Sequence, residues 1–214
     1  MHIALIVFLI IIGIPIFLIT WHTIVRIIRK IHPFPIPQFF TNIIDNPIRR
    51  KYWQIPEEIA TRMGVEPGDI VLEIGPGKGT YTKAVANLTE PNGKVFTIDI
   101  QQPVLDRLEK ILEEEKITNI FPKLDNAYNL SFKDNYFDVI FAIACLPEIP
   151  KPVDVLKEFK RVLKPGGTIS LCELFIDPDY PLRRTEKKWA DRASLTLKDE
   201  YGNWFSYQLN FTKK

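Results

Sequence analysis

From about residue 56 onward, short apolar runs alternate with segments of helical character. Runs rich in Ile, Val and Phe have the length and composition of buried parallel strands; they lie at 70–74, 94–99, 119–124, 137–143 and 168–174. Helices are expected between and before them, at 56–63, 82–88, 103–115 and 152–163. In the last of these, Leu156 and Phe159 recur at helical spacing and Pro152 suits the first turn. This alternation predicts an α/β domain, which we place at residues 56–214.

Two further β segments end the chain. The stretches 195–201 and 204–211 are predicted strands, and they are joined at Gly202-Asn203, a pair typical of a tight turn. A dehydrogenase more often continues with helix and strand into a substrate domain. A closing hairpin after five parallel strands therefore argues against that class of enzyme.

The amino terminus has the most apolar pattern of the chain, because residues 3–25 contain no Asp, Glu, Lys or Arg. As a helix, this run would be about 34 Å long at 1.5 Å per residue, enough to cross a bilayer core of roughly 30 Å. A cleaved signal peptide is the alternative, but no basic residue precedes the run and no small-residue cleavage site follows it. Membrane helices tolerate residues such as Gly13 and Pro15. We therefore expect a single transmembrane anchor helix at residues 1–28.

Basic residues lie on one side of this expected anchor. None precedes the apolar run, and several follow it: Arg26, Arg29, Lys30, Arg49, Arg50 and Lys51. Because positive charge favours the cytoplasmic side, we expect the amino terminus outside, Trp21 near the interface, and the domain in the cytoplasm. The two cysteines, Cys145 and Cys172, stand in apolar runs without a metal-ligand companion, which predicts core packing in a reducing compartment.

Residues 29–55 are expected to form a juxtamembrane linker and lid segment. Prolines at the alternate positions 33, 35 and 37 forbid a regular helix, so this part predicts a stiff, extended linker. Its aromatic residues Phe34, Phe39 and Phe40 either lie in the headgroup layer or pack on the domain, and both alternatives stay open.

Composition and charge narrow the choice of partners. The chain has 214 residues, of which 46% are hydrophobic, so it can hold one full-sized domain and little more. A net charge of +2 without a long basic stripe gives no reason to expect a nucleic-acid partner. The run Glu113-Glu114-Glu115 is typical of a solvated helix end, and the histidines do not cluster, so no metal site is predicted.

The first predicted strand ends in an acid followed by alternate glycines: Glu73, Gly75, Gly77 and Gly79. Glycines at this spacing let the backbone turn sharply and approach a ligand, while the following helix offers unpaired N–H groups. The dinucleotide fingerprint G-x-G-x-x-G is not met, because position 80 holds Thr. A phosphate loop is excluded as well, because the Gly-Lys pair is followed by Gly rather than Ser or Thr. The spacing indicates a nucleotide-like cofactor without a pyrophosphate.

The pattern Glu-x-Gly-x-Gly-x-Gly at 73–79 resembles the first motif of the class I S-adenosylmethionine-dependent methyltransferases. Three further segments resemble later motifs of that family in the right order: the strand that ends in Asp99, the adenine turn and fourth strand at 126–140, and the turn at 161–168. The likeness covers roughly residues 60–212 and is greatest to the branch of ubiquinone and menaquinone biosynthesis methyltransferases. It implies a Rossmann-like, seven-stranded, mostly parallel sheet whose last strand runs antiparallel beside the fifth.

This resemblance implies S-adenosyl-L-methionine as cofactor and a set of cofactor-binding residues: Glu73, Gly75, Gly77, Gly79, Asp99, Ile100, Asn126 and Ala127. The glycines would pass beside the methionine portion, and Glu73 would orient the loop or meet the amino group. Asp99 would accept both ribose hydroxyls, with Ile100 beside the adenine. The family's turn usually has Asp before Ala, whereas this chain has Asn126, with Asp125 one place earlier. An Asn carbonyl can still accept from the adenine amino group.

No catalytic residue is identified from the sequence. Methyl transfer from a sulfonium needs chiefly orientation and exclusion of water, and a general base only if the acceptor must lose a proton. Glu148, after the fourth strand, is a candidate base, with a loop-fixing carboxylate as the alternative. In related methyltransferases the segment before the first strand often closes over the cofactor. Tyr52 and Trp53 are therefore candidates for lining an acceptor site, with ordinary packing as the alternative.

The expected function is that of a membrane-anchored methyltransferase acting on a hydrophobic or lipid-like acceptor, such as a quinone precursor, a phospholipid or a lipophilic small molecule. Tethering raises the encounter rate of a domain with molecules dissolved in the bilayer. Methylation of a protein or a soluble metabolite is one alternative. A non-catalytic, membrane-anchored cofactor-binding module is another, and the oligomeric state is left open.

Overall fold

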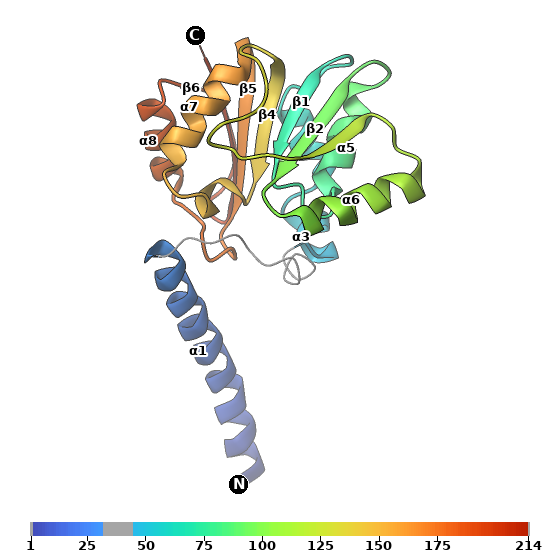
Figure 1. Ribbon diagram of the computed structural model, residues 1–214. Coiled ribbons are helices and arrows are strands. Elements are labelled where there is room, and N and C mark those ends of the chain that lie inside the picture. Colours follow the sequence, from blue (N-terminus) through green and yellow to red (C-terminus); the bar gives the residue numbers. More distant parts are fainter. Residues whose placement is uncertain (1, 32–44, 214) are drawn as a thin grey trace.

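The computed structural model describes residues 2–31 and 45–213. Within these residues lies a seven-stranded sheet with the order β3-β2-β1-β4-β5-β7-β6 (Figure 1). The strands are β1 (Ile70–Ile74), β2 (Lys94–Asp99), β3 (Ile120–Leu124), β4 (Phe137–Ile143), β5 (Leu163–Leu174), β6 (Thr196–Gly202) and β7 (Ser206–Thr212). The first five pair in parallel, and β7 runs antiparallel between β5 and β6. The prediction of a mostly parallel sheet with an antiparallel last strand beside the fifth is confirmed.

The central strands are apolar at nearly every position because helices cover both faces of the sheet. Successive side chains of a strand point to opposite faces, so Val71 belongs to one core and Leu72 to the other. The core that contains Val71 is closed by α4 (Pro56–Arg62), α5 (Thr80–Thr89) and α6 (Gln102–Glu115). The core that contains Leu72 is closed by α7 (Pro152–Val162) and α8 (Arg183–Arg192).

The strand order reverses between β1 and β4, because the chain adds β2 and β3 on one side of β1 before it returns to the other side. The loops that follow β1 and β4 therefore diverge at the carboxyl edge of the sheet. In open α/β sheets this switch point is where ligands bind.

The chain begins with a helix of 30 residues, α1 (His2–Ile31), which extends away from the sheet (Figure 1). Its segment Ile12–Arg29 is long and apolar enough to cross a membrane, judged by length and composition. The carboxyl-terminal end of α1 is bound to the domain, because Arg29 pairs with Asp179 and Arg26 donates to the carbonyl of Tyr180. The prediction that this apolar segment is helical is thus confirmed, and its insertion into a membrane stays a prediction.

Within residues 2–31 and 45–213, two helices were not expected from the sequence: α3 (Pro47–Tyr52) and α8. α8 lacks an apolar stripe, because Trp189 and Ala190 are the apolar residues in an otherwise polar segment. Its buried face is completed by Glu186, whose side chain lies in the core. Burial raises the pKa of Glu186, which lies beside the buried carboxyl of Glu173, so its neutral form is favoured and can occupy a position normally held by an apolar residue.

The fifth strand begins at Leu163, five residues before its predicted start. The turn-like sequence Lys164-Pro165-Gly166-Gly167 is part of an irregularity in β5, where the register against β4 shifts between Phe137 and Val139. A Cβ on Gly167 would lie 2.6 Å from the carbonyl oxygen of Asp138, so the two strands approach closely here. The proline-rich linker, with Phe34, Phe39 and Phe40, lies outside the described residues, and the predicted boundaries of anchor, linker and domain stay predictions.

Candidate functional site

A cavity of about 380 Å³ opens at the switch point of the sheet. Its walls come from the loops that follow β1, β2, β3 and β4, together with Asp45 and Arg49 from the segment before the domain. Most of the residues predicted to bind a cofactor line this cavity: Glu73, Gly75, Gly77, Asp99, Ile100, Asn126 and Ala127. The fold therefore brings together residues that are far apart in the sequence.

Gly75 and Gly77 have backbone conformations and surroundings that favour glycine. Their φ angles are +72° and +55°, in the left-handed region where a side chain is strained. A Cβ on Gly75 would come within 2.6 Å of the Cys145 sulfur, so the loop after β4 leaves no space for a side chain. A Cβ on Gly77 would meet no atom of the described residues within 4 Å, and it would stand at the cavity wall.

Gly79 is the predicted cofactor-binding residue that does not line the cavity. It is the N-cap of α5, with φ of +76°. A Cβ at this position would lie 2.5 Å from Cδ1 of Leu108 on α6. The third glycine of the motif therefore allows the start of α5 to pack closely against α6.

Glu73 is a buried carboxyl at the end of β1 that also lines the cavity. The hydroxyl of Thr82, on α5, donates a hydrogen bond to it. Burial raises the pKa of Glu73 to about 8, although the Thr82 hydrogen bond acts in the opposite direction. The side chain thus joins the strand to the helix across the glycine loop and is neutral at pH 7 in the protein alone.

Asp99 and Ile100 lie side by side at the end of β2. The Asp99 carboxylate accepts a hydrogen bond from the backbone N–H of Gln101 at 2.8 Å, which fixes it at the cavity wall. Burial raises its pKa above the usual range. Ile100 keeps 59% of its surface exposed, which is unusual for an isoleucine inside a domain and leaves an apolar wall for a ligand.

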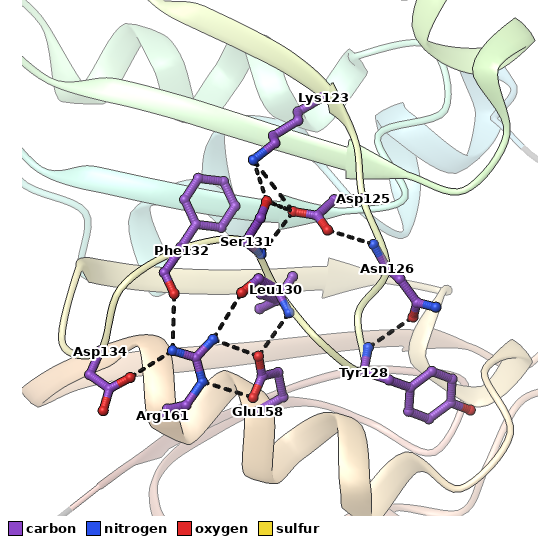
Figure 2. A network of polar contacts seen from close by, with 10 residues as sticks. All are labelled: Lys123, Asp125, Asn126, Tyr128, Leu130, Ser131, Phe132, Asp134, Glu158 and Arg161. Atoms are coloured by element: carbon purple, nitrogen blue, oxygen red, sulfur yellow. Dashed lines mark hydrogen bonds and ion pairs between the residues drawn. The ribbon is translucent and has the colours of Figure 1, made fainter.

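The turn after β3 is held by its own side chains (Figure 2). The side-chain oxygen Oδ1 of Asn126 accepts from the backbone N–H of Tyr128 at 3.0 Å. The Asp125 carboxylate accepts from the backbone N–H of Asn126 at 2.8 Å. Asp125 also accepts from the hydroxyl of Ser131. Asp125 therefore stabilises the turn, while Asn126 and the neighbouring Ala127 form part of the cavity wall.

Arg161, on α7, anchors the rest of this loop (Figure 2). Its guanidinium donates to the carbonyls of Leu130 and Phe132, both at 2.9 Å, and pairs with Asp134 at 2.6 Å. Glu158, one helical turn earlier, pairs with Arg161 and accepts from the N–H of Leu130 at 2.8 Å. The sequence placed Arg161 at the turn into β5, and its role in holding a cavity loop depends on contacts across about 30 positions of the chain.

The segment before the domain contributes different residues from those expected. Tyr52 and Trp53 do not line the cavity; Tyr52 is exposed, and Trp53 packs edge-on against Phe205. Asp45 lines it instead and accepts from the Thr80 hydroxyl at 2.6 Å, which joins this segment to the start of α5. Arg49 is buried beside it, and its Nε donates to Gln54 at 2.6 Å. The capping residue Asn46, which accepts from the N–H of Arg49, was the available sequence signal for α3.

The loop after β4 forms the remaining wall, with Cys145, Glu148 and Pro150. The Tyr128 hydroxyl donates to the Pro150 carbonyl and joins this loop to the turn after β3. Glu148 forms an ion pair with Arg29 of α1, with Nη2 and Oε1 3.4 Å apart. Burial raises the pKa of the Cys145 thiol well above its usual value, so it is protonated at pH 7.

Neither cysteine forms a disulfide, and Cys172 is fully buried in the core, as predicted. Cys145 departs from that expectation because it is part of the cavity wall. Over residues 2–31 and 45–213, no group of three or more His, Cys, Asp or Glu side chains could hold a metal ion.

Comparison with known proteins adds three findings. Residues 72–171 match the family model described as a methyltransferase domain. The chain is 35% identical over 144 residues to an uncharacterized methyltransferase of Schizosaccharomyces pombe, and 32% identical over 124 residues to the demethylmenaquinone methyltransferase of Geobacillus sp. (strain WCH70). These alignments cover 63% and 58% of this chain but 51% and 53% of the relatives, so the chain spans about half the length of the curated relatives it matches.

A solved structure of an S-adenosylmethionine-dependent methyltransferase from Aquifex aeolicus has the same fold. The TM-score is 0.78, and the match covers 84% of this chain and 100% of that chain at 18% sequence identity.

Proposed function

We propose that this chain, whose residues 72–171 match a methyltransferase domain, is a class I S-adenosylmethionine-dependent methyltransferase that transfers a methyl group to a hydrophobic or lipid-like acceptor at a membrane. In this proposal α1 spans the membrane once and the domain faces the cytoplasm. Candidate acceptors are a quinone precursor, a phospholipid or another lipophilic small molecule. The likeness of the domain to methyltransferases supports the methyl-transfer reaction. The contacts between α1 and the domain support a hydrophobic or lipid-like acceptor.

The cavity fits the cofactor in size and in the chemistry of its walls. Its volume of about 380 Å³ falls within the range of ligand pockets, roughly 300–1,000 Å³. The Asp99 carboxylate would accept the ribose hydroxyls, since the Gln101 N–H occupies only part of its acceptor capacity. Ile100 and Ala127 would contact the adenine, and the backbone at Gly75 and Gly77 would pass beside the methionine portion.

Asn126 and Glu73 would have more limited roles. The Asn126 carbonyl oxygen has two lone pairs, so it can accept from the adenine amino group while it also accepts from Tyr128. Glu73 would orient the glycine loop through its contact with Thr82. Gly79 would act indirectly. It lets the start of α5 approach α6 and thereby shapes the glycine loop, although it does not line the cavity.

Bound S-adenosylmethionine supplies a methyl group that its sulfonium makes electrophilic. The residues of this chain orient the two substrates and exclude water. Tyr128 and Asp45 serve that purpose, because each joins two cavity walls that come from distant segments. The ion pair between Glu148 and Arg29 supports a structural role for Glu148 in fixing the loop after β4, the alternative to a general base.

One contact carries the proposal of a hydrophobic acceptor. Arg29, near the end of α1, pairs with Glu148 in the cavity wall. A bilayer crossed by α1 would therefore lie next to the cavity, and an acceptor dissolved in that bilayer would need only a short path to the methyl donor. The demethylmenaquinone methyltransferase among the relatives supports a quinone precursor as one such acceptor.

The proposal is tested by incubating the detergent-purified full chain with methyl-labelled S-adenosylmethionine and a lipid extract of its host. We expect label in the organic phase after extraction. A chain carrying Asp99→Asn is the matched control, because it should keep the fold while losing cofactor affinity. Label in protein or in aqueous metabolites alone would contradict the lipid acceptor. Cofactor binding without any transfer would favour a binding module.

A further inference from the structure

Five apolar side chains from separate segments form one exposed patch beside α1, which we call the interfacial patch: Trp53, Phe175, Ile176, Trp204 and Phe205. Trp53 packs on Phe205 with ring centroids 5.2 Å apart, and Phe175 packs on Trp204 at 5.4 Å. The exposed fractions are 41% for Phe175, 49% for Ile176 and 70% for Trp204. Large aromatic side chains that are gathered and exposed in this way usually mark an interaction surface.

The interfacial patch is a fixed part of the fold. The backbone N–H of Phe175 donates to the carbonyl of Phe205 at 2.7 Å, so the loop between β5 and α8 is bound to the turn between β6 and β7. The hydroxyl of Tyr180 donates to the carbonyl of Trp204 and adds a second link. Both loops lie at the carboxyl edge of the sheet, next to the end of α1 (Figure 1).

The same loop is bound to α1 at the point where the charge-free run ends. Nε2 of His22 lies 3.1 Å from the carbonyl oxygen of Ile176, and Arg26 donates to the carbonyl of Tyr180. Residues 3–25 of the chain contain no Asp, Glu, Lys or Arg, and Arg26 is the first Lys or Arg after them. The interfacial patch is therefore level with the last apolar turn of α1, where a helix that spans a bilayer meets the headgroups.

We propose that the interfacial patch inserts into the headgroup layer of the membrane that α1 crosses. This inference rests on the proposed function, because it takes α1 as the anchor. Tryptophan and phenylalanine favour the membrane interface, where apolar side chains are buried about 5–10 Å into the boundary between headgroups and acyl chains. Trp21, which is exposed on α1 and stacks with Phe17, belongs to the same level.

A second attachment changes what the anchor alone can do. A single helix can tilt in the bilayer together with the domain that is bound to it, whereas the interfacial patch fixes which edge of the sheet faces the lipid. That edge holds the loop after β4 with Glu148, which borders the cavity and contacts α1. The patch thereby holds the cavity toward the bilayer, so that an acceptor can enter without crossing water.

The test uses the full chain in vesicles of phosphatidylcholine and phosphatidylglycerol, with or without bromine on the acyl chains next to the headgroups. The chain has four tryptophans, at positions 21, 53, 189 and 204, so three variants that each keep one of them, with Phe at the other three positions, report separate places. Trp21 reports the anchor, Trp204 the interfacial patch, and Trp189, partly buried on α8, serves as the control.

We expect bromine to quench Trp204 about as strongly as Trp21 and to leave Trp189 unquenched. Quenching of Trp21 without quenching of Trp204 would overturn the interfacial patch and leave the anchor in place. Failure to quench Trp21 would overturn the anchor and the patch together. Equal quenching of Trp189 and Trp204 would show that the whole domain adheres to lipid, which also contradicts a specific patch. Because Trp204 is exposed, its removal in the other two variants should not disturb folding, which far-UV circular dichroism checks.

Discussion

Arg29 and Glu148 form an ion pair between the first helix of the chain and the wall of the cavity, with 3.4 Å between Nη2 and Oε1. Arg29 is buried and also pairs with Asp179 in the loop after β5. A basic residue that was expected to follow a transmembrane anchor is thus in contact with the domain. Through these two ion pairs, α1 is joined to the loop after β4 in the cavity wall and to the loop after β5.

Replacing Arg29 should reduce methylation of a bilayer acceptor without changing cofactor binding. In Arg29→Met, Glu148 and Asp179 lose their shared cation, and breaking a buried ion pair on one side typically costs about 3–5 kcal/mol. We expect methylation of a bilayer acceptor to fall while the Kd for S-adenosylmethionine stays unchanged. Arg29→Lys should recover part of the activity, because it keeps the charge but lacks the planar fork. Equal activity of wild type and Arg29→Met would show that the contact has no functional role.

A bulky residue at Gly77 should abolish cofactor binding. Gly77→Leu adds a side chain at the cavity wall, where the new Cβ meets no atom of the described residues within 4 Å, so we expect the fold to accept it and the cofactor to be excluded. Gly64→Leu is the matched control, because Gly64 has a φ of +73°, is equally open, and is not in the cavity. Both variants carry a backbone strain of about 1–2 kcal/mol. Isothermal titration should detect binding for the Gly64 variant and none for the Gly77 variant; retained affinity in Gly77→Leu would refute the site.

Asp99 should contribute to cofactor affinity through its charge. Asp99→Asn keeps an oxygen for the Gln101 N–H but weakens the acceptance of ribose hydroxyls. Hydrogen bonds to charged groups contribute about 1.5–3 kcal/mol, so we expect the Kd to rise about 10- to 100-fold. Asp106→Asn, an exposed change on α6, should leave it unchanged. An equal effect of the two substitutions would contradict ribose binding by Asp99.

Stability of the protein without cofactor should fall as the pH rises, because of Glu73. Its pKa is about 8 in the fold and 4.5 when unperturbed, so the folded chain keeps a proton that the unfolded chain has lost. The stabilisation is therefore complete below about pH 4.5 and disappears as the pH rises to about 8. Thermal unfolding at about pH 5 and about pH 8 should show a smaller difference in Tm for Glu73→Gln than for wild type. Glu114→Gln, on an exposed face, should behave like wild type; a wild-type slope in Glu73→Gln would show that its pKa is not raised.

The strands and the glycine loop could be predicted from the sequence because their signals are local. Each of the five buried strands, including the one that ends in Asp99, and the motif at 73–79 can be recognised from a short stretch of sequence. The residues that line the cavity could be predicted only in part. Gly79 matched the motif, yet its neighbour is Leu108 on another helix, and no local pattern records that contact.

The features that were missed depend on contacts between distant segments. α8 reads as a polar segment because its buried face includes a neutral carboxyl, Glu186, whose protonation follows from burial and not from composition. Asp45 lines the cavity and Tyr52 does not, because the Asp45 carboxylate accepts a hydrogen bond from the distant Thr80 hydroxyl. The interfacial patch, with Trp204, needed the closing hairpin to be placed beside the loop after β5.

We propose above that the chain methylates an acceptor in the membrane that its first helix crosses. The most direct measurement compares two preparations with equal amounts of full chain and host lipid extract, both supplied with labelled S-adenosylmethionine. In one, protein and extract share the same vesicles; in the other, they occupy separate vesicles that are mixed. A tethered enzyme whose cavity faces its own bilayer predicts rapid labelling in the shared vesicles and little in the separate ones. Equal rates in both preparations would contradict methylation within the bilayer that holds the chain.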